Sequence, residues 1–133
     1  MSRRAVRTEE APAPVAGAPY SQAIAAAGGE VVWVSGQVPL TPAGELAAAD
    51  VAGQTRQCLA NVAAIVRAAG GTMDDVVKTT VFMTDLGEFG AMNAVYAEAF
   101  GDVPPARATI GVAALPAGAS VEIEAVVVIG ATR

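Results

Sequence analysis

Arg107 is the residue in this sequence best suited to hold a small anion. It follows two prolines in the segment PPARAT at positions 104–109, and it is the only basic residue between Lys78 and Arg133. Its small neighbours leave room beside the long side chain, and a planar guanidinium can grip a carboxylate through two hydrogen bonds. A structural salt bridge or a surface arginine would suit the same position, so the sequence leaves these alternatives open.

Two carboxylates offer acid–base chemistry. Glu122 and Glu124 lie in the segment SVEIEAVVV at positions 120–128, which has the composition of a strand. Residues two apart on a strand share a face, about 7 Å from each other. Burial or mutual repulsion would raise the pKa of one carboxyl and suit it to general acid–base catalysis. Both groups would equally be solvated or paired, with Arg107 as the obvious partner.

Four further positions are candidates for binding a ligand. Tyr20 offers a ring wall and a hydroxyl, or merely fills the core. Ser35 and Gly36 stand near a strand end, where a glycine lets a ligand approach the backbone, although a plain bulge explains them equally well. Asn93 falls within an expected helix, where an exposed amide is the ordinary outcome.

Composition excludes several kinds of chemistry. The 133 residues include no His and one Cys, so catalysis by a Ser-His-Asp or Cys-His set and metal binding by imidazole are ruled out. Cys58 lies on an apolar helical stripe and is expected to be a small buried hydrophobe. The net charge of −5 argues against a broad nucleic-acid surface. We expect no metal site.

Seven elements must position these residues. With 53% hydrophobic and 16% charged residues, the chain can build a packed core. Apolar periodicity, β-branched runs and glycine or proline breaks predict the order β-β-α-β-α-β-β, which is an α+β fold with a mixed sheet and two helices on one face. The first two strands are expected to form a hairpin about Gly28-Gly29. The expected elements are strands 20–27 and 30–37, helix 50–69, strand 76–84, helix 86–100, and strands 106–112 and 120–129.

Residues 1–18 are expected to form a flexible N-terminal arm, followed by a single domain at 19–133. The arm begins with three arginines, but acidic residues and prolines interrupt the apolar run that a secretory signal requires. No apolar stretch is long enough to span a membrane. We therefore expect a cytoplasmic protein that binds no membrane.

The expected strands carry apolar residues at both odd and even positions, and so on both of their faces, most clearly in VVWV, VVKTTVF and AVVVIG. An antiparallel sheet with one face in water should alternate instead. Since helices can cover one face only, the second face is expected to pack against other copies of the chain.

Six segments together resemble the RidA (YjgF-type) family of reactive intermediate deaminases. They occur in the family order and cover roughly residues 9 to 129. The matching segments are APYSQA at 18–23, VSGQVP at 34–39, QTRQCLANVAAIV at 54–66, VVKTTVFMTDL at 76–86, PARAT at 105–109 and VEIEA at 121–125.

The resemblance implies a chorismate-mutase-like fold and a homotrimer with three sites between subunits. It implies hydrolysis of 2-imino acids or their enamine tautomers, such as those released by pyridoxal-phosphate enzymes, to 2-keto acids and ammonia. The enzymes of this family use no cofactor, and the reaction removes reactive metabolites before they cause damage. The implied partners are therefore a small imino or keto acid and two further copies of the chain, with no nucleic acid.

The resemblance also assigns roles to individual residues. Arg107 would bind the substrate carboxylate, and Glu122 would act beside the reactive water. Thr109 stands where the family often has Cys, so no thiol is needed for turnover here, and its hydroxyl can still orient ligand or water. The remaining positions implied to bind substrate are Tyr20, Ser35, Gly36 and Asn93.

Two other functions remain open at the level of sequence. The same pocket would serve a trimer that binds 2-keto acids and regulates without turnover. A third interpretation is an RNA-cleaving inhibitor of translation. The net negative charge of the chain and the absence of His both argue against it.

Overall fold

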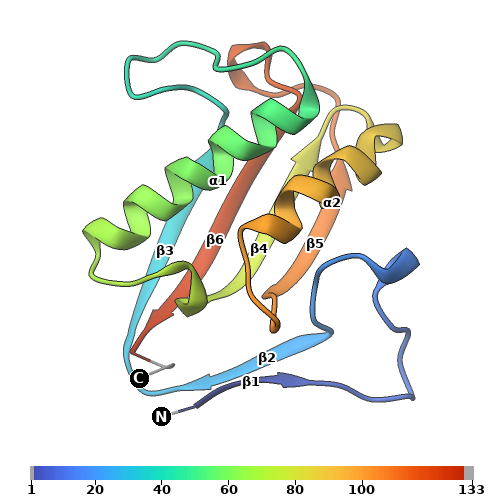
Figure 1. Ribbon diagram of the computed structural model, residues 1–133, viewed down its shortest axis with the longest axis vertical. Helices are drawn as coiled ribbons and strands as arrows, with labels where there is room; N and C mark the ends of the chain where they lie inside the picture. The colour runs from blue at the N-terminus through green and yellow to red at the C-terminus, as the bar shows by residue number, and fades with distance from the viewer. Residues whose placement is uncertain (1, 131–133) are drawn as a thin grey trace.

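Four strands form the main sheet, in the spatial order β3-β6-β4-β5. β4 and β5 run parallel, whereas β6 is antiparallel to both of its neighbours, so the sheet is mixed as expected (Figure 1). The computed structural model describes residues 2–130. The strands span Glu30–Gln37 in β3, Val76–Met83 in β4, Ala106–Gly111 in β5 and Val121–Ile129 in β6.

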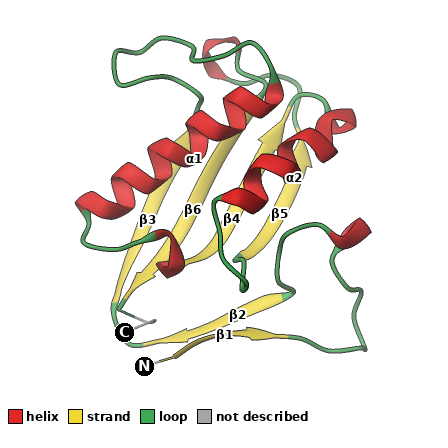
Figure 2. Cartoon of the chain, in the orientation of Figure 1, coloured by secondary structure: helices red, strands yellow, loops and turns green. Residues whose placement is uncertain are grey.

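Two helices cover one face of this sheet, as Figures 1 and 2 show. α1 spans Val51–Ala68 and α2 spans Phe89–Glu98. The helix expected over 86–100 begins later, because Leu86–Glu88 forms a separate 3-10 turn that the Asp85 side chain caps by accepting a hydrogen bond from a backbone N–H. In the part of the chain described, no helix is long and apolar enough to cross a membrane.

The core lies between the helices and the sheet. Alternate residues of β6 point toward the helices and are almost fully buried, as the period of two requires. α1 meets them with a stripe of apolar residues at spacings of three and four. The buried residues on these two elements include Cys58, Leu59, Val62 and Val66 of α1 and Val121, Ile123, Ala125 and Val127 of β6.

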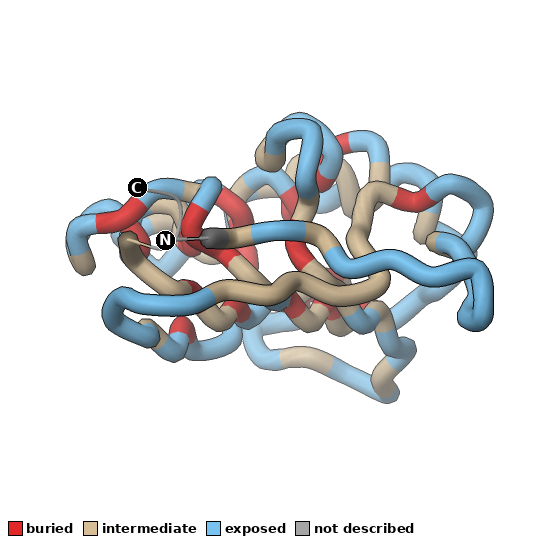
Figure 3. The backbone as a smooth tube through the Cα atoms, turned by 90° about the horizontal axis from the view of Figure 1, so that it is seen from below, coloured by how far each residue is buried: buried red, intermediate tan, exposed pale blue. Residues whose placement is uncertain are grey.

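The arm expected over residues 1–18 contains a strand. β1 (Ser2–Val6) pairs antiparallel with β2 (Ala23–Ala27), and the two form a separate ribbon. Arg3 anchors this ribbon, because its Nη2 donates a hydrogen bond of 2.9 Å to the carbonyl of Val76 at the start of β4. Figure 3 shows that the chain after β1 is exposed, while the buried segments lie inside the molecule.

The expected hairpin between the first two long strands is not formed. β2 pairs with β1 instead of β3, and Ser21, two positions before β2, forms an isolated bridge with Ala106 of β5. Gly28 and Gly29 adopt φ values of 72° and 110°, which turn the chain out of the main sheet. β2 consists almost entirely of alanine, so its side chains specify partner and register only weakly.

The face of the sheet opposite the helices is uncovered in a single chain. Trp33 is 76% exposed, and Val31 and Ile110 are 47% and 45% exposed. The pairings place Trp33 opposite Val126 and Val31 opposite Val128, all on this face. A large apolar surface of this kind is typical of a protein interface.

Candidate functional site

Arg107 lies on the helix-covered face of β5. It pairs with Thr79 of β4, and the Thr79 hydroxyl is hydrogen-bonded to that of Tyr96 on α2 at 2.7 Å. Because cross-strand partners share a face, Arg107 projects toward α2. Thr109 follows two positions later on the same face, as predicted from the alternation of the strand.

Three aromatic rings surround the guanidinium. Its central carbon lies 4.7 Å from the ring centroid of Tyr96, 5.2 Å from that of Tyr20 and 5.5 Å from that of Phe89. Each distance suits a cation–π contact. Arg107 Nη1 also approaches the Met92 sulfur at 3.9 Å. We call these four residues, Tyr20, Phe89, Met92 and Tyr96, the aromatic cage.

The aromatic cage surrounds the Arg107 guanidinium with rings and a sulfur and, within residues 2–130, with no carboxylate that would neutralise its charge. Arg107 Nη2 is buried and has no hydrogen-bond partner among the described residues, and the same holds for the Thr109 hydroxyl oxygen. Burial lowers the pKa of Arg107, while Tyr96 and Tyr20 favour its charged form. An arginine nevertheless stays protonated at neutral pH. The site therefore offers a positive charge, a free donor and a hydroxyl.

These groups open into a pocket of about 420 Å³. Tyr20 closes one side, and its hydroxyl accepts a hydrogen bond of 2.9 Å from the backbone N–H of Val15. Three apolar residues complete the wall. The lining is Val15, Tyr20, Leu86, Phe89, Arg107 and Thr109.

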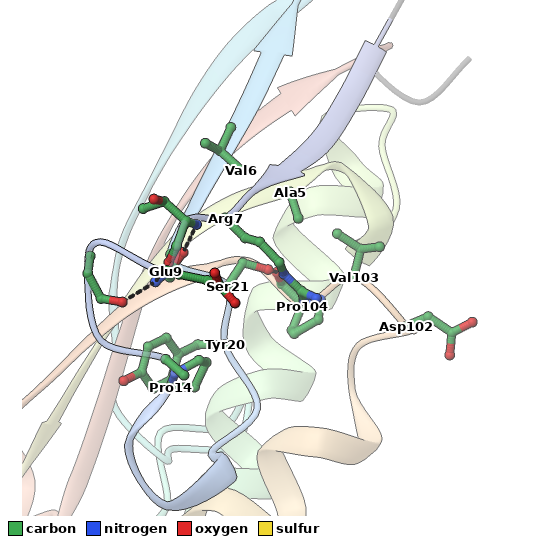
Figure 4. Close-up of a pocket in the computed structure, with 14 residues that line it drawn as sticks. Ala5, Val6, Arg7, Glu9, Pro14, Tyr20, Ser21, Asp102, Val103 and Pro104 are labelled. Atoms are coloured by element: carbon green, nitrogen blue, oxygen red, sulfur yellow. Dashed lines mark hydrogen bonds between the residues drawn. The ribbon is translucent and has the colours of Figure 1, made fainter.

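A second cleft of about 580 Å³, which Tyr20 also lines, lies between the N-terminal arm and the chain at 102–104. In Figure 4 the side chain of Arg7 extends across it toward Pro104, and Tyr20 lies beside Pro14. Its lining carries both acidic and basic side chains on exposed segments. The Arg107 pocket is the better candidate site, because unpartnered buried polar atoms point to a missing ligand.

Glu122 lies away from this pocket, on the uncovered face of the sheet. It pairs with Phe82, whereas its neighbours Val121 and Ile123 are buried beneath the helices. Gly36 is packed against it, since a Cβ at that position would overlap the Glu122 carboxylate. Ser35 is exposed beside Gly36. Glu122 and Arg107 therefore lie on opposite faces of the sheet, and the salt bridge between them that the sequence suggested does not form within one chain.

The remaining candidates are scattered. Asn93 is half-buried on α2 next to Met92, does not line the pocket, and has a buried amide oxygen without a partner in the described chain. Glu124 is exposed opposite Thr80. The structure thus forms two groups: Arg107, Thr109 and Tyr20 on one face, and Glu122, Ser35 and Gly36 on the other.

Several site residues were missed from the sequence. Phe89, Met92 and Tyr96 have the spacing of an ordinary helical core stripe, and Met92 and Tyr96 are fully buried. The same stripe also contacts Arg107, because their spacing of three and four residues aligns them over β5. Leu86 is 49% exposed at the pocket wall.

Known proteins match this chain over nearly its whole length. The model of the family described as Endoribonuclease L-PSP matches residues 8–129. Protein DfrA of Myxococcus xanthus is 43% identical over 129 residues, covering 96% of this chain and 97% of its own length. The 2-iminobutanoate/2-iminopropanoate deaminase of Mus musculus is also 43% identical over 129 residues, with coverage of 96% and 93%.

A solved structure agrees with the fold. RidA from the Antarctic bacterium Psychrobacter sp. is 41% identical, aligns with a TM-score of 0.73, and the alignment covers 95% of this chain and 99% of that one. Sequence and structure therefore lead to one conclusion: the chain belongs to the Endoribonuclease L-PSP family, which is the YjgF/RidA family that its motifs resemble.

Proposed function

We propose that this protein hydrolyses 2-imino acids, or their enamine tautomers, to 2-keto acids and ammonia. The observation that carries the proposal is the half-buried Arg107 guanidinium, which lines the pocket and whose buried Nη2 has no partner in the described chain. The 43% identity to the murine protein named 2-iminobutanoate/2-iminopropanoate deaminase supports the same activity.

Arg107 binds the carboxylate of the substrate. The aromatic cage presents ring faces and a sulfur to the guanidinium, none of which neutralises its charge. A carboxylate that reaches Nη2 gains a charge-assisted hydrogen bond in a site sheltered from water. Thr109, two positions along β5, supplies a hydroxyl to the same ligand or to a water molecule.

The reaction consumes one water molecule. As the water oxygen bonds to C2 of the protonated imine, the electron pair of the C=N π bond moves to nitrogen and one water proton passes to a proton-carrying group. The proton of the new hydroxyl then passes to the nitrogen, the C–N bond breaks, and the C=O bond of the keto acid forms. The departing ammonia takes up the proton from the carrying group and leaves as ammonium. The balance requires only water and a group that carries a proton, so the reaction proceeds without a cofactor.

Glu122 is proposed as that proton carrier. Because it lies on the face of the sheet opposite Arg107, the two residues meet only where a second copy of the chain supplies one of them. The exposed apolar face around Trp33 offers a surface on which copies pack. We therefore propose a homotrimer with its sites between subunits, in which Ser35 and Gly36 accompany Glu122.

The activity is tested by following ammonia and keto acid from an imine that an amino-acid oxidase generates in situ. Arg107→Ala is expected to lower kcat/KM by about 100-fold, because a buried charged hydrogen bond is lost. Arg56→Ala, at an exposed arginine of α1, is the matched control and should keep the wild-type rate. Near-normal turnover by the folded Arg107→Ala protein would contradict the assignment.

The two other functions are outcomes of the same tests. Binding of 2-ketobutyrate by calorimetry, together with no acceleration of imine hydrolysis, would favour a regulatory ligand-binding protein. The family description names an endoribonuclease, but this chain has a net charge of −5 and no His. Cleavage of RNA that purifies with the protein and is lost in Arg107→Ala would favour a nuclease.

A further inference from the structure

The helix-covered face of β5 presents three positions in a row, and the first two of them line the pocket. Arg107, Thr109 and Gly111 alternate along the strand, about 7 Å apart. Leu86 fills the space above Gly111, because a Cβ there would lie 3.2 Å from Leu86 Cδ1 and 3.3 Å from Cγ. The pocket is therefore ordered along β5 as a cation, a hydroxyl and an apolar side chain.

Two apolar side chains in the pocket wall are open to solvent. Leu86 is 49% exposed and Val15 is 62% exposed, and both line the pocket beside Phe89. Among the described residues that line it, Arg107 alone is charged. Apolar side chains exposed within a concave site are typical of contact with an apolar part of a ligand.

A ligand anchored at Arg107 is oriented by this order. Its carboxylate meets the guanidinium, its reacting carbon lies nearer Thr109, and its side chain extends toward Leu86 and Val15. A methyl group is too short to cover these residues, whereas a longer apolar chain removes their surface from water. A charged side chain would lose hydration against the apolar wall without gaining a partner.

We propose that the site is selective for 2-imino acids with long apolar side chains, of the kind derived from leucine, methionine or phenylalanine, and that Leu86 is a specificity-determining residue. The proposal rests on the deaminase function inferred above. It assigns Leu86 no part in the chemical step. Its side chain acts by contact with the substrate side chain, with Gly111 leaving the space that Leu86 occupies.

The experiment compares kcat/KM for imines generated from alanine, leucine, phenylalanine and glutamate. The leucine-derived imine is expected to exceed the alanine-derived one by about 10-fold or more, as for other pockets that recognise added methylenes. Leu86→Ser should reduce this ratio about 10-fold, and Val15→Ser, on the exposed arm, should reduce it in the same direction. Leu46→Ser is the matched control, because Leu46 is a similarly exposed leucine outside the pocket.

Failure of the specificity and failure of the function give different results. Equal rates for the alanine and leucine imines, or an unchanged ratio in both Leu86→Ser and Val15→Ser, would overturn the specificity while deaminase activity stands. If the wild type accelerates no imine, the function fails. Calorimetry with pyruvate and 4-methyl-2-oxopentanoate then decides the pocket preference, and equal affinities would overturn it.

Discussion

Arg107 and Glu122 lie on opposite faces of one sheet. Arg107 pairs with Thr79 of β4, whose hydroxyl meets Tyr96 on the helix side, whereas Glu122 pairs with Phe82, three positions further along β4. An odd separation along a strand reverses the face. A site that uses both the cation and the carboxylate therefore needs more than one copy of the chain.

This relationship predicts complementation between two inactive variants. Arg107→Ala and Glu122→Gln should each be nearly inactive alone. When they are refolded together into mixed trimers, some sites combine an intact Arg107 with an intact Glu122 from a different copy. With random mixing in a cyclic trimer, about a quarter of the wild-type specific activity should return. Imine hydrolysis measures the recovery.

Tagged copies provide the control for mixing. Native mass spectrometry of the refolded sample, with a tag on one variant, shows whether mixed assemblies have formed. Mixed trimers that remain as inactive as the separate variants would place both residues' roles within a single copy, or remove one of them from catalysis.

A glycine at position 36 is predicted to be needed for activity, because any larger residue would displace the Glu122 carboxylate. Gly36→Ala places a methyl group where the carboxylate now lies, and the flexible end of Glu122 must move away. We expect kcat to fall about 10- to 100-fold, a part of the roughly 100- to 10,000-fold that a placed proton carrier contributes, with little change in Tm. The measurements are imine hydrolysis and thermal unfolding.

Gly90→Ala is the matched control for this change. A Cβ at Gly90, in the first turn of α2, meets nothing within 4 Å. Alanine there should leave turnover unchanged and slightly stabilise the helix. Full activity of Gly36→Ala would show that the carboxylate's present position is not needed.

The ring of Tyr96 is predicted to support ligand binding by holding the Arg107 guanidinium in place, and its hydroxyl is predicted to contribute to stability. Tyr96→Phe keeps the ring 4.7 Å from the Arg107 guanidinium but leaves the buried Thr79 hydroxyl without its partner. We expect a lower Tm, since an unsatisfied buried hydroxyl costs about 1–3 kcal/mol, and nearly wild-type KM. Tyr96→Leu should raise KM about 10-fold, because a sheltered cation–π contact is lost. Equal KM values for the two variants would contradict the role of the ring.

The order of the elements follows from the sequence, but two features of the chain do not. The seven expected segments match β2 to β6 and the two helices, because their apolar periodicity and glycine breaks are strong. β1 was not expected, since SRRAV has little strand character and gains its structure from pairing with β2. The alanines of β2 carry no preference for β3, so the sequence favoured a hairpin that the chain does not form.

The candidate site was predictable only where one strand determines it. Arg107 and Thr109 share a face by simple alternation, and the structure confirms that they line one pocket. Whether Arg107 and Glu122 share a face depends on the register across β4, which no local pattern contains. Tyr96 has the spacing of a core residue and is buried in the core. Nothing in the sequence therefore distinguishes it as a residue that also contacts Arg107.

Stability is predicted to fall in alkaline solution because of Cys58. Burial between α1 and the sheet raises the pKa of its thiol to about 12, and the negative charge of Glu122 acts in the same direction. In the unfolded chain the thiol returns to an ordinary pKa near 9. The folded state therefore holds a proton that the unfolded state releases, and stability is complete below that value and lost as the pH rises toward 12.

The free energy of unfolding, measured by denaturant titration from pH 7 to 11, should decline above about pH 9 with a slope of at most about 1.4 kcal/mol per pH unit from this thiol. Burial also raises the pKa of Tyr96 to about 12, which steepens the decline above pH 10. Cys58→Ala leaves a small cavity and lowers stability at every pH, so the slope between pH 9 and 10 is the informative quantity. It should flatten in Cys58→Ala, and an unchanged slope there would assign the alkaline loss to other groups.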